Sequence, residues 1–213
     1  ARSFAKLIPI VGVGGVSNEP ALSIANSVLQ EMLAFPHAWK WNRVELASFL
    51  TVENVQDYTR TVSNFYWLES ALMEDDASTS VIKPKTEIEV VRKLELTHLV
   101  HNPAKVASVS ETSTTVTFRF FPVPGTTVWR AYLNYQAKPP LKTVLSNTWT
   151  PVPDEYSFVY KQGFLAYALK MAGDDRAPQE MATFYGMMQE AVMQSRAEQS
   201  DIQFCPTQGI MRG

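Results

Sequence analysis

Apolar residues recur at helical spacing in two regions of the chain, one towards each end. The first region follows Pro20, and its apolar side chains return every three or four positions, at Leu22, Ala25, Leu29, Met32 and Leu33. This spacing places them on one face of a helix. Ser17 or Asn18 can cap this helix, and the pair Phe35-Pro36 should end it.

The second helical region starts at Asp154, which is a good capping residue, and it predicts two helices joined by a short turn. The first of them carries an apolar stripe of Phe158, Leu165, Ala168 and Leu169, and Gly173 should close it. The second begins near Pro178 and carries Met181, Phe184, Tyr185, Met188, Ala191 and Val192. Because the connecting turn is so short, we expect the two helices to pack as an antiparallel hairpin.

Between these helical regions the apolar positions alternate, which is typical of strands. The strongest signal lies at 103–138, where AKVASVSE, TTVTFRFFP and TTVWRAYLNYQ are separated by turn residues. These three segments predict an antiparallel meander with Val116, Phe118 and Phe120 on one face, and Pro124-Gly125 supplies its last turn.

The rest of the middle region has weaker signals. Residues 35–72 predict short strands and tight turns, and the polar run 73–80 predicts a surface loop. The segment 85–99 fits a strand or a helix, and its alternation favours the strand. Four prolines in 138–155 forbid a regular helix there and predict an extended connector.

Together these patterns predict an α+β fold. We expect helices towards both ends, including a helical hairpin, an antiparallel β region between them, and extended termini. The expected regions are an N-terminal arm with the first helix (1–34), a mostly antiparallel β region (35–150), a C-terminal helical hairpin (151–198) and a C-terminal tail (199–213).

The composition is that of an ordinary globular protein. The chain has 213 residues, of which 46% are hydrophobic and 19% are charged, and no apolar run approaches the roughly 20 residues that cross a bilayer. We therefore expect neither a signal peptide nor a membrane span. A net charge of −2 gives no global attraction to nucleic acid or anionic lipid. With Cys205 as its only cysteine, the chain has no internal disulfide framework, which suits a reducing compartment.

Residues able to do chemistry are few. His98 and His101 lie three apart and could begin a metal site on a helix, but no further ligands follow at a useful spacing. Cys205 falls in a segment without periodicity, where a nucleophile is hard to orient. GVGG at 12–15 matches neither a dinucleotide fingerprint nor a phosphate loop. We expect no catalytic residue, no metal and no cofactor.

The tryptophans allow two interpretations. With Arg43 and Arg130 they could stack on single-stranded bases, but the acidic pI of about 6.0 favours packing in cores and interfaces instead. The residues concerned are Trp39, Trp41, Trp67, Trp129 and Trp149.

Two further features indicate contacts with other subunits. Met187 and Met193 fall off the main stripe of the last helix, which predicts a second apolar face buried against a neighbouring subunit. Both ends of the chain are also apolar without helical or strand periodicity. The tail carries Ile202, Phe204, Ile210 and Met211.

Several motifs resemble structural proteins of tailed bacteriophages. They are FPHAWKWNR, ENVQDYT, FRFFPVPG, and the run YQAKPPL followed by TWTPVPDEYSFVYKQGFLAYALKMAGDDR. In that group an aromatic strand and a Pro-Pro connector lead into a helix start, and a Gly-Asp turn separates two helices. The chain resembles the head-to-tail connector proteins, called adaptors or neck proteins.

This resemblance implies a helical bundle or hairpin packed with an inserted antiparallel β domain, and a structural role without enzymatic activity. The expected protein is a subunit of a homo-oligomeric ring, commonly of twelve copies, that joins the portal to a tail or nozzle protein and lines the DNA channel. DNA would pass without sequence specificity, and no membrane is involved. We expect assembly in the host cytoplasm and residence in the neck or tail of the virion. The resemblance implies portal docking by the tail, and its candidates are Ile202, Phe204, Pro206, Ile210, Met211 and Arg212.

Two alternatives stay open at this point. One is a tail-tip or capsid-decorating structural protein that binds partners or glycans through its β region. The other is a metal-dependent hydrolase built on His98 and His101.

Overall fold

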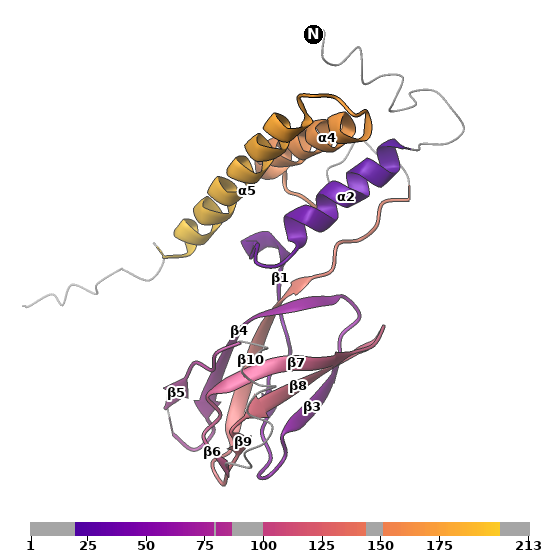
Figure 1. The fold of residues 1–213 in the computed structure, drawn as a ribbon. Coiled ribbons are helices and arrows are strands. Elements are labelled where there is room, and N and C mark those ends of the chain that lie inside the picture. Colours follow the sequence, from indigo (N-terminus) through magenta and orange to yellow (C-terminus); the bar gives the residue numbers. More distant parts are fainter. Residues whose placement is uncertain (1–19, 79, 87–99, 144–150, 201–213) are drawn as a thin grey trace, which may run out of the picture. The chain divides into compact units, whose positions relative to one another are not determined.

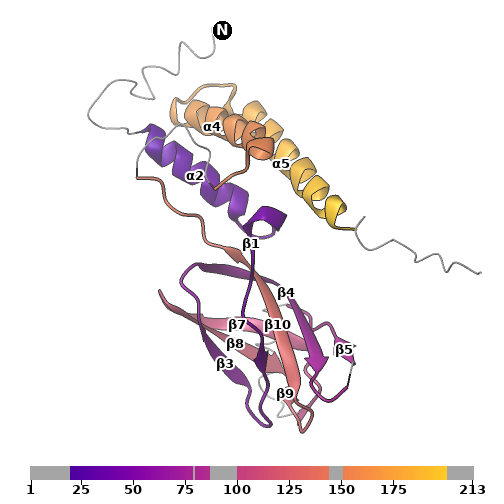
Figure 2. The ribbon, with the colours of Figure 1, turned by 180° about the vertical axis from the view of Figure 1, so that it is seen from behind.

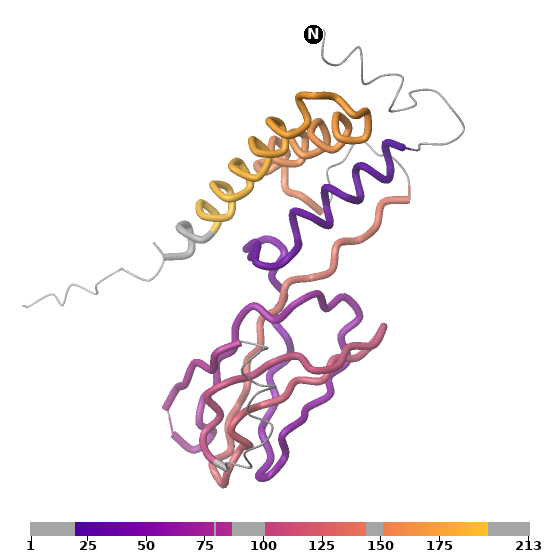
Figure 3. Tube along the Cα trace, in the orientation of Figure 1, coloured from indigo at the N-terminus to yellow at the C-terminus, as the bar shows by residue number. Residues whose placement is uncertain are grey.

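The structure, a computed structural model, describes residues 20–78, 80–86, 100–143 and 151–200. The chain divides into two compact units. The helical unit contains the residues up to Trp41 and those from Pro139 onward; the β unit, Asn42–Lys138, is inserted between them (Figures 1 and 3). The predicted α+β class is confirmed, and strands form a larger part of it than a helical bundle with an insert suggests.

The described part of the helical unit contains three α-helices (Figures 1 and 2). They are α2 (Ala21–Leu33), α4 (Ser157–Met171) and α5 (Ala177–Ser200). Two single-turn 3-10 helices accompany them, η1 (Lys40–Asn42) and η2 (Asp154–Tyr156). As predicted, α4 and α5 form an antiparallel hairpin, and α2 packs against α4.

The first helix follows the sequence pattern closely. α2 begins directly after Pro20 and ends before the Phe35-Pro36 pair, as expected. The predicted capping residues Ser17 and Asn18 lie outside the described residues. Of the predicted stripe, Leu22 is half-buried and the other four residues are buried.

The turn of the hairpin is fixed by Gly173, as predicted. This glycine has a φ of +65°, and its N–H donates to the carbonyl of Lys170, while the N–H of Asp174 donates to the carbonyl of Leu169. This pair of bonds is a Schellman motif, which satisfies the last carbonyls of α4. Arg176 then forms an ion pair with Asp174 across the turn, at 2.8 Å.

The three helices meet at a glycine in the middle of α4. A Cβ atom on Gly163 would lie 2.7 Å from both Phe184 of α5 and Val28 of α2. A larger residue has no room there, so this glycine allows both neighbours to approach the backbone of α4 closely. After α2, the buried Trp39 donates its indole N–H to the carbonyl of Met32 and contacts Tyr156 edge to face, at 5.2 Å between ring centroids.

Two predictions for α4 are wrong. Asp154 makes no capping hydrogen bond, because it starts η2 and α4 begins one turn later. Phe158 is 45% exposed instead of belonging to the apolar stripe. The helix contacts both α2 and α5, and it therefore buries more than one side, including Val159, Tyr160 and Ala166. A helix with apolar residues on several sides gives no clear single stripe in its sequence.

The β unit contains short and long strands in three sheets (Figure 1). The first sheet has the order β1-β10-β4-β5, with β2 also paired to β10; the second has the order β3-β8-β7; β6 and β9 form a parallel pair. The bounds are β1 (Arg43–Glu45), β2 (Phe49–Leu50), β3 (Asp57–Thr61), β4 (Phe65–Asp75), β5 (Val81–Ile82), β6 (Val100–His101), β7 (Lys105–Glu111), β8 (Thr115–Phe121), β9 (Val123–Pro124) and β10 (Trp129–Ala137).

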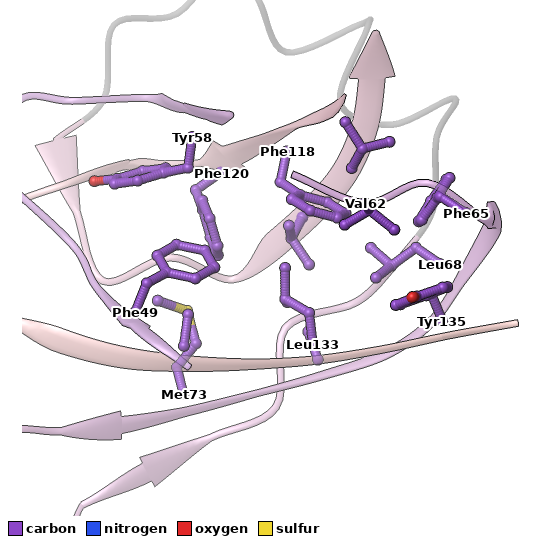
Figure 4. Packing of buried hydrophobic residues seen from close by; sticks show 14 of the residues in the cluster. Phe49, Tyr58, Val62, Phe65, Leu68, Met73, Phe118, Phe120, Leu133 and Tyr135 are labelled. Atoms are coloured by element: carbon purple, nitrogen blue, oxygen red, sulfur yellow. The ribbon is translucent and has the colours of Figure 1, made fainter. Parts of the chain in front are cut away.

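One continuous core fills the space between the two larger sheets (Figure 4). The residues Val116, Phe118 and Phe120, predicted to share a face, are all fully buried in it. Around them the rings of Phe49, Tyr58, Phe65 and Tyr135 make edge-to-face and tilted contacts. The alternation of buried and half-buried residues along β8 and β10 is that of strands with one face in a core.

The predicted three-stranded meander is wrong in its last step. β7 and β8 pair antiparallel as expected, but β10 leaves their sheet and pairs with β4, β1 and β2 in the other. Alternation predicts each strand but carries no information about its partner. Gly125 is not in the positive φ region that the expected turn would use.

Two more strand predictions have different outcomes. The run 73–80 is not wholly a loop, because β4 continues to Asp75 and β5 begins at Val81. Most of the segment 85–99, for which a strand was favoured, lies outside the described residues.

Candidate interaction surfaces

The outward side of α5 carries few charges. The helix buries Phe184, Met188, Ala191, Val192 and Ser195. On the opposite side lie the exposed, uncharged residues Ala182, Gly186, Gln189 and Met193, with the exposed Glu190 beside them. Met193 is 69% exposed, while Met187 is half-buried at the edge of the buried stripe. The structure therefore places the two methionines on different parts of the helix, and a subunit contact through them stays a prediction.

The tail candidates cannot be placed. Ile202, Phe204, Pro206, Ile210, Met211 and Arg212 all lie outside the described residues, as does the apolar N-terminal arm.

The carboxylate of Glu31 connects the three α-helices through hydrogen bonds. Glu31 of α2 accepts hydrogen bonds from the hydroxyls of Tyr167 on α4 and Tyr185 on α5. Burial first, and the negative charge of Glu31 second, raise the pKa of Tyr167 to about 12. Burial raises the pKa of Tyr160 likewise to about 12, and its hydroxyl donates to the carbonyl of Ala25. These contacts hold the hairpin against α2, so the position of α5 and its outward side is fixed within the helical unit.

The β unit carries an exposed apolar patch that the sequence did not predict. It consists of Leu50, Val52, Val55 and Val128, which are between 37% and 57% exposed, and we call it the tip patch. Leu50 pairs with Arg130 of β10. One step further along, the N–H of Thr51 donates to the carbonyl of Trp129. The patch thus lies at the end of β10 opposite to the residues that connect the β unit to the rest of the chain.

The alternation of the strands explains why these side chains face outward. Phe49 and Thr51 are buried, whereas Leu50 and Val52 between and after them are exposed. Trp129 is buried and its neighbour Val128 is exposed in the same way. Because successive side chains point to opposite faces, the exposed residues share the outer face of the sheet.

Acidic residues surround the tip patch. Glu53 follows Val52, and the N–H of Asp76 donates to the carbonyl of Val128. Beside them lies a hollow of about 310 Å³, lined by Glu74, Asp75, Asp76, Ala77, Ser78 and Arg130. Arg130 makes an ion pair with Asp76 at 2.8 Å. Three carboxylates, of Glu74, Asp75 and Asp76, therefore share the lining of this hollow with the guanidinium of Arg130, which leaves the rim negative.

The acidic loop is held in place by its own hydrogen bonds. Asp75 accepts from the N–H of Ala77 at 3.0 Å and from the hydroxyl of Ser78 at 2.8 Å. These bonds favour the ionised form, so the pKa of Asp75 lies below its usual range. The carboxylates of the rim are thus presented on a structured loop.

The structure gives little support to a catalytic or metal site. His101 is exposed on β6, where its Nδ1 accepts from the N–H of Asn102, and His98 and Cys205 lie outside the described residues. Among the residues that the structure does describe, no three His, Cys, Asp or Glu side chains gather as metal ligands would. The sequence already gave His101 no further partners at a useful spacing.

The tryptophans are placed for packing. Trp39 and Trp129 are buried, and Trp41 and Trp67 are half-buried. Trp149 lies outside the described residues. Buried indoles cannot offer their faces to bases, which favours the packing interpretation.

Comparison with protein families gives a match over most of the chain. The family model described as SU10 adaptor protein matches residues 26–208, a span that contains the whole β unit and the hairpin. No curated protein matches the chain. None of the described helices has the length and hydropathy of a transmembrane segment.

Proposed function

Since the chain belongs to the SU10 adaptor protein family, a family of phage head-to-tail adaptors, we propose that it is a subunit of the adaptor ring that joins the portal to the tail. The observation that carries this proposal is the family match over residues 26–208. The resemblance noted in the sequence to head-to-tail connector proteins agrees with it. The protein is accordingly a structural component of the virion rather than an enzyme.

Ring formation is supported by the surface of the helical unit. A ring needs two different surfaces on each copy, which meet when the rotation between copies closes the circle. The outward side of α5 around Met193 is one such surface, because a 69% exposed methionine on a side with few charges gains from burial against a neighbour. Met187 lies at the edge of this side. Twelve copies are the expected number.

The partners of the ring follow from the same role. The tail residues Ile202, Phe204, Pro206, Ile210, Met211 and Arg212 dock on the portal, and a tail or nozzle protein binds the opposite side of the ring. Fixing a bound segment costs roughly 1–2 kcal/mol of backbone entropy per residue, and burial of the apolar side chains of the tail against the portal would offset that cost.

The channel function is supported by charge. DNA must slide through the ring without being held, and a chain with a net charge of −2 does not bind phosphates strongly as a whole. DNA would pass without recognition of its sequence.

Electron micrographs of particles that lack this protein test the proposal. We expect heads that fill but then leak or carry no tail, because the ring that joins portal and tail is missing. Tailed particles that fail to adsorb would instead indicate a tail-tip protein, and intact infectious particles would contradict any role at the neck.

A further inference from the structure

The tip patch and its acidic rim have a matching segment elsewhere in the chain. We propose that the N-terminal arm, residues 2–16, of a second copy binds the tip patch, an inference that rests on the proposed ring. The patch supplies apolar side chains and a negative rim, and the arm supplies apolar side chains with positive charge.

The patch has the form of a docking surface. Val52 and Val128 are opposite each other when the register that pairs Leu50 with Arg130 is continued by two residues. At the position between, the N–H of Thr51 donates to the carbonyl of Trp129 at 2.8 Å, and the N–H of Trp129 donates to the side-chain hydroxyl of Thr51 at 2.9 Å. Opposite residues of this kind have their Cβ atoms about 5 Å apart and form one continuous surface. Leu50 extends this surface along β2, so an extended segment can lie across it.

The rim selects a basic partner. Three carboxylates, of Glu74, Asp75 and Asp76, line the hollow beside Val128. Arg130 pairs with Asp76, which leaves excess negative charge for the side chain of an incoming Arg or Lys. An acidic segment would be repelled at this position.

Of the segments outside the described residues, only the N-terminal arm has the required chemistry. Residues 1–18 contain Arg2 and Lys6 and no acidic residue. Their apolar residues are Phe4, Leu7, Ile8, Ile10, Val11, Val13 and Val16. The segment 87–99 carries three Glu against Arg92 and Lys93, the segment 144–150 is uncharged, and Arg212 of the tail is balanced by Asp201.

Binding of each copy's N-terminal arm by the next copy is compatible with a closed ring. Each copy would donate one arm and accept one arm, which is a contact between two different surfaces and can close a circle. If fully extended, eighteen residues would reach about 60 Å.

Disulfide trapping between differently sized copies tests the inference. One full-length chain carries Ile8→Cys and a size tag, the other carries Val52→Cys, and both carry Cys205→Ser. After mixing and mild oxidation, we expect linked heterodimers to form about tenfold faster than with Val109→Cys in place of Val52→Cys. Val109 is a matched control because it is also exposed (37%) but lies on β7, in the other sheet.

Two outcomes would overturn the inference. Linkage at the rate of the Val109→Cys control means that the arm does not bind the tip patch. Linkage only within a single chain that carries both Ile8→Cys and Val52→Cys means that the arm folds back onto its own copy.

Charge variants give a second measurement in the chain without added cysteines. Val52→Lys with Val128→Lys repels Arg2 and Lys6, and we expect self-association to weaken by about tenfold, while Val109→Lys leaves it unchanged. Both substituted valines are exposed, so the core of the β unit is not disturbed.

Light scattering on the same samples separates the two proposals. A ring that forms while Ile8→Cys and Val52→Cys link no faster than the Val109→Cys control, or a ring that is unaffected by Val52→Lys with Val128→Lys, contradicts arm exchange and leaves the adaptor function standing. A chain that forms no ring even with the portal contradicts the adaptor function and arm exchange together.

Discussion

At the scale of single residues, two glycines on neighbouring helices have opposite roles. Gly163 is where α2 and α5 approach the backbone of α4, and there is no space for a Cβ atom beside Phe184 and Val28. Gly186 on α5 has no atom within 4 Å of the position of a Cβ. The same substitution should therefore have opposite effects at the two positions.

Gly163→Ala is expected to destabilise the protein by about 1–2 kcal/mol, because forcing an atom into a packed junction outweighs the gain in helix propensity. Gly186→Ala is the control and should stabilise it by up to about 1 kcal/mol. Thermal and denaturant unfolding followed by circular dichroism measure both. Equal stabilisation by the two variants would show that the junction is looser than described.

Two tyrosines make the helical unit sensitive to alkali. The pKa values of Tyr160 and Tyr167 are raised to about 12 in the folded protein from 10. A folded pKa above the unfolded one means that their contribution is fully present below pH 10 and is lost as the pH rises from 10 to 12.

We therefore expect the free energy of unfolding to fall steeply between pH 10 and 12, and to fall less steeply in Tyr160→Phe, which cannot ionise. Urea titrations at a series of pH values, with tyrosinate absorbance at each, measure the effect. An unchanged slope in Tyr160→Phe would show that Tyr160 ionises as freely when folded as when unfolded.

At the scale of elements, local patterns predicted the helices and strands better than their partners. The Schellman turn at Gly173 was predictable because one glycine determines it. The sheet to which β10 belongs could not be predicted, because its pairing with β4 joins residues about 60 positions apart in the sequence. Phe158 was misassigned for a similar reason, since the number of helices around α4 is a property of the tertiary structure.

The tip patch could not be predicted from the sequence, because the strands that carry it are short. Leu50 and Val52 alternate with buried neighbours, but β2 has only two residues, and this gives too few positions for the two faces to be told apart. The tail and arm candidates rest on composition alone, which indicates a need for partners without naming them.

The β unit should fold without the rest of the chain. Its ends are adjacent, because Arg43 pairs with Gln136 and Asn42 donates to the carbonyl of Ala137 at 2.9 Å, and it has its own core. We expect residues 42–138 to unfold cooperatively as an isolated fragment.

Differential scanning calorimetry of that fragment measures this prediction, with Phe118→Ala in the fragment as a control. Loss of the fully buried Phe118 should lower stability by about 3–5 kcal/mol. A fragment that shows no cooperative transition would mean that the β unit depends on contacts outside its own core.

At the scale of the whole molecule, the account assigns different tasks to different parts of the chain. The hairpin gives a supported outward surface on α5, the β unit gives the tip patch with its acidic rim, and the two ends carry apolar residues that we propose bind neighbouring subunits. None of these features needs a reactive group. They fit a family whose members connect other phage proteins.

The subunit contact on α5 can be tested by changing the charge of its outward side. Met193→Glu adds a negative charge at a 69% exposed position and should weaken ring formation by about tenfold without lowering the stability of the monomer. Gln179→Glu, also exposed but near the start of the helix, is the control. Unchanged assembly of Met193→Glu would exclude this part of α5 from the contact.

Under the proposed function, this chain is an adaptor that binds the portal as a closed ring. Size-exclusion chromatography with light scattering, on the purified chain alone and mixed with the portal of its particle, measures this directly. The account predicts a complex whose mass equals the portal plus a full ring of this chain, commonly twelve copies. A monomer that never joins the portal at any ratio would contradict it.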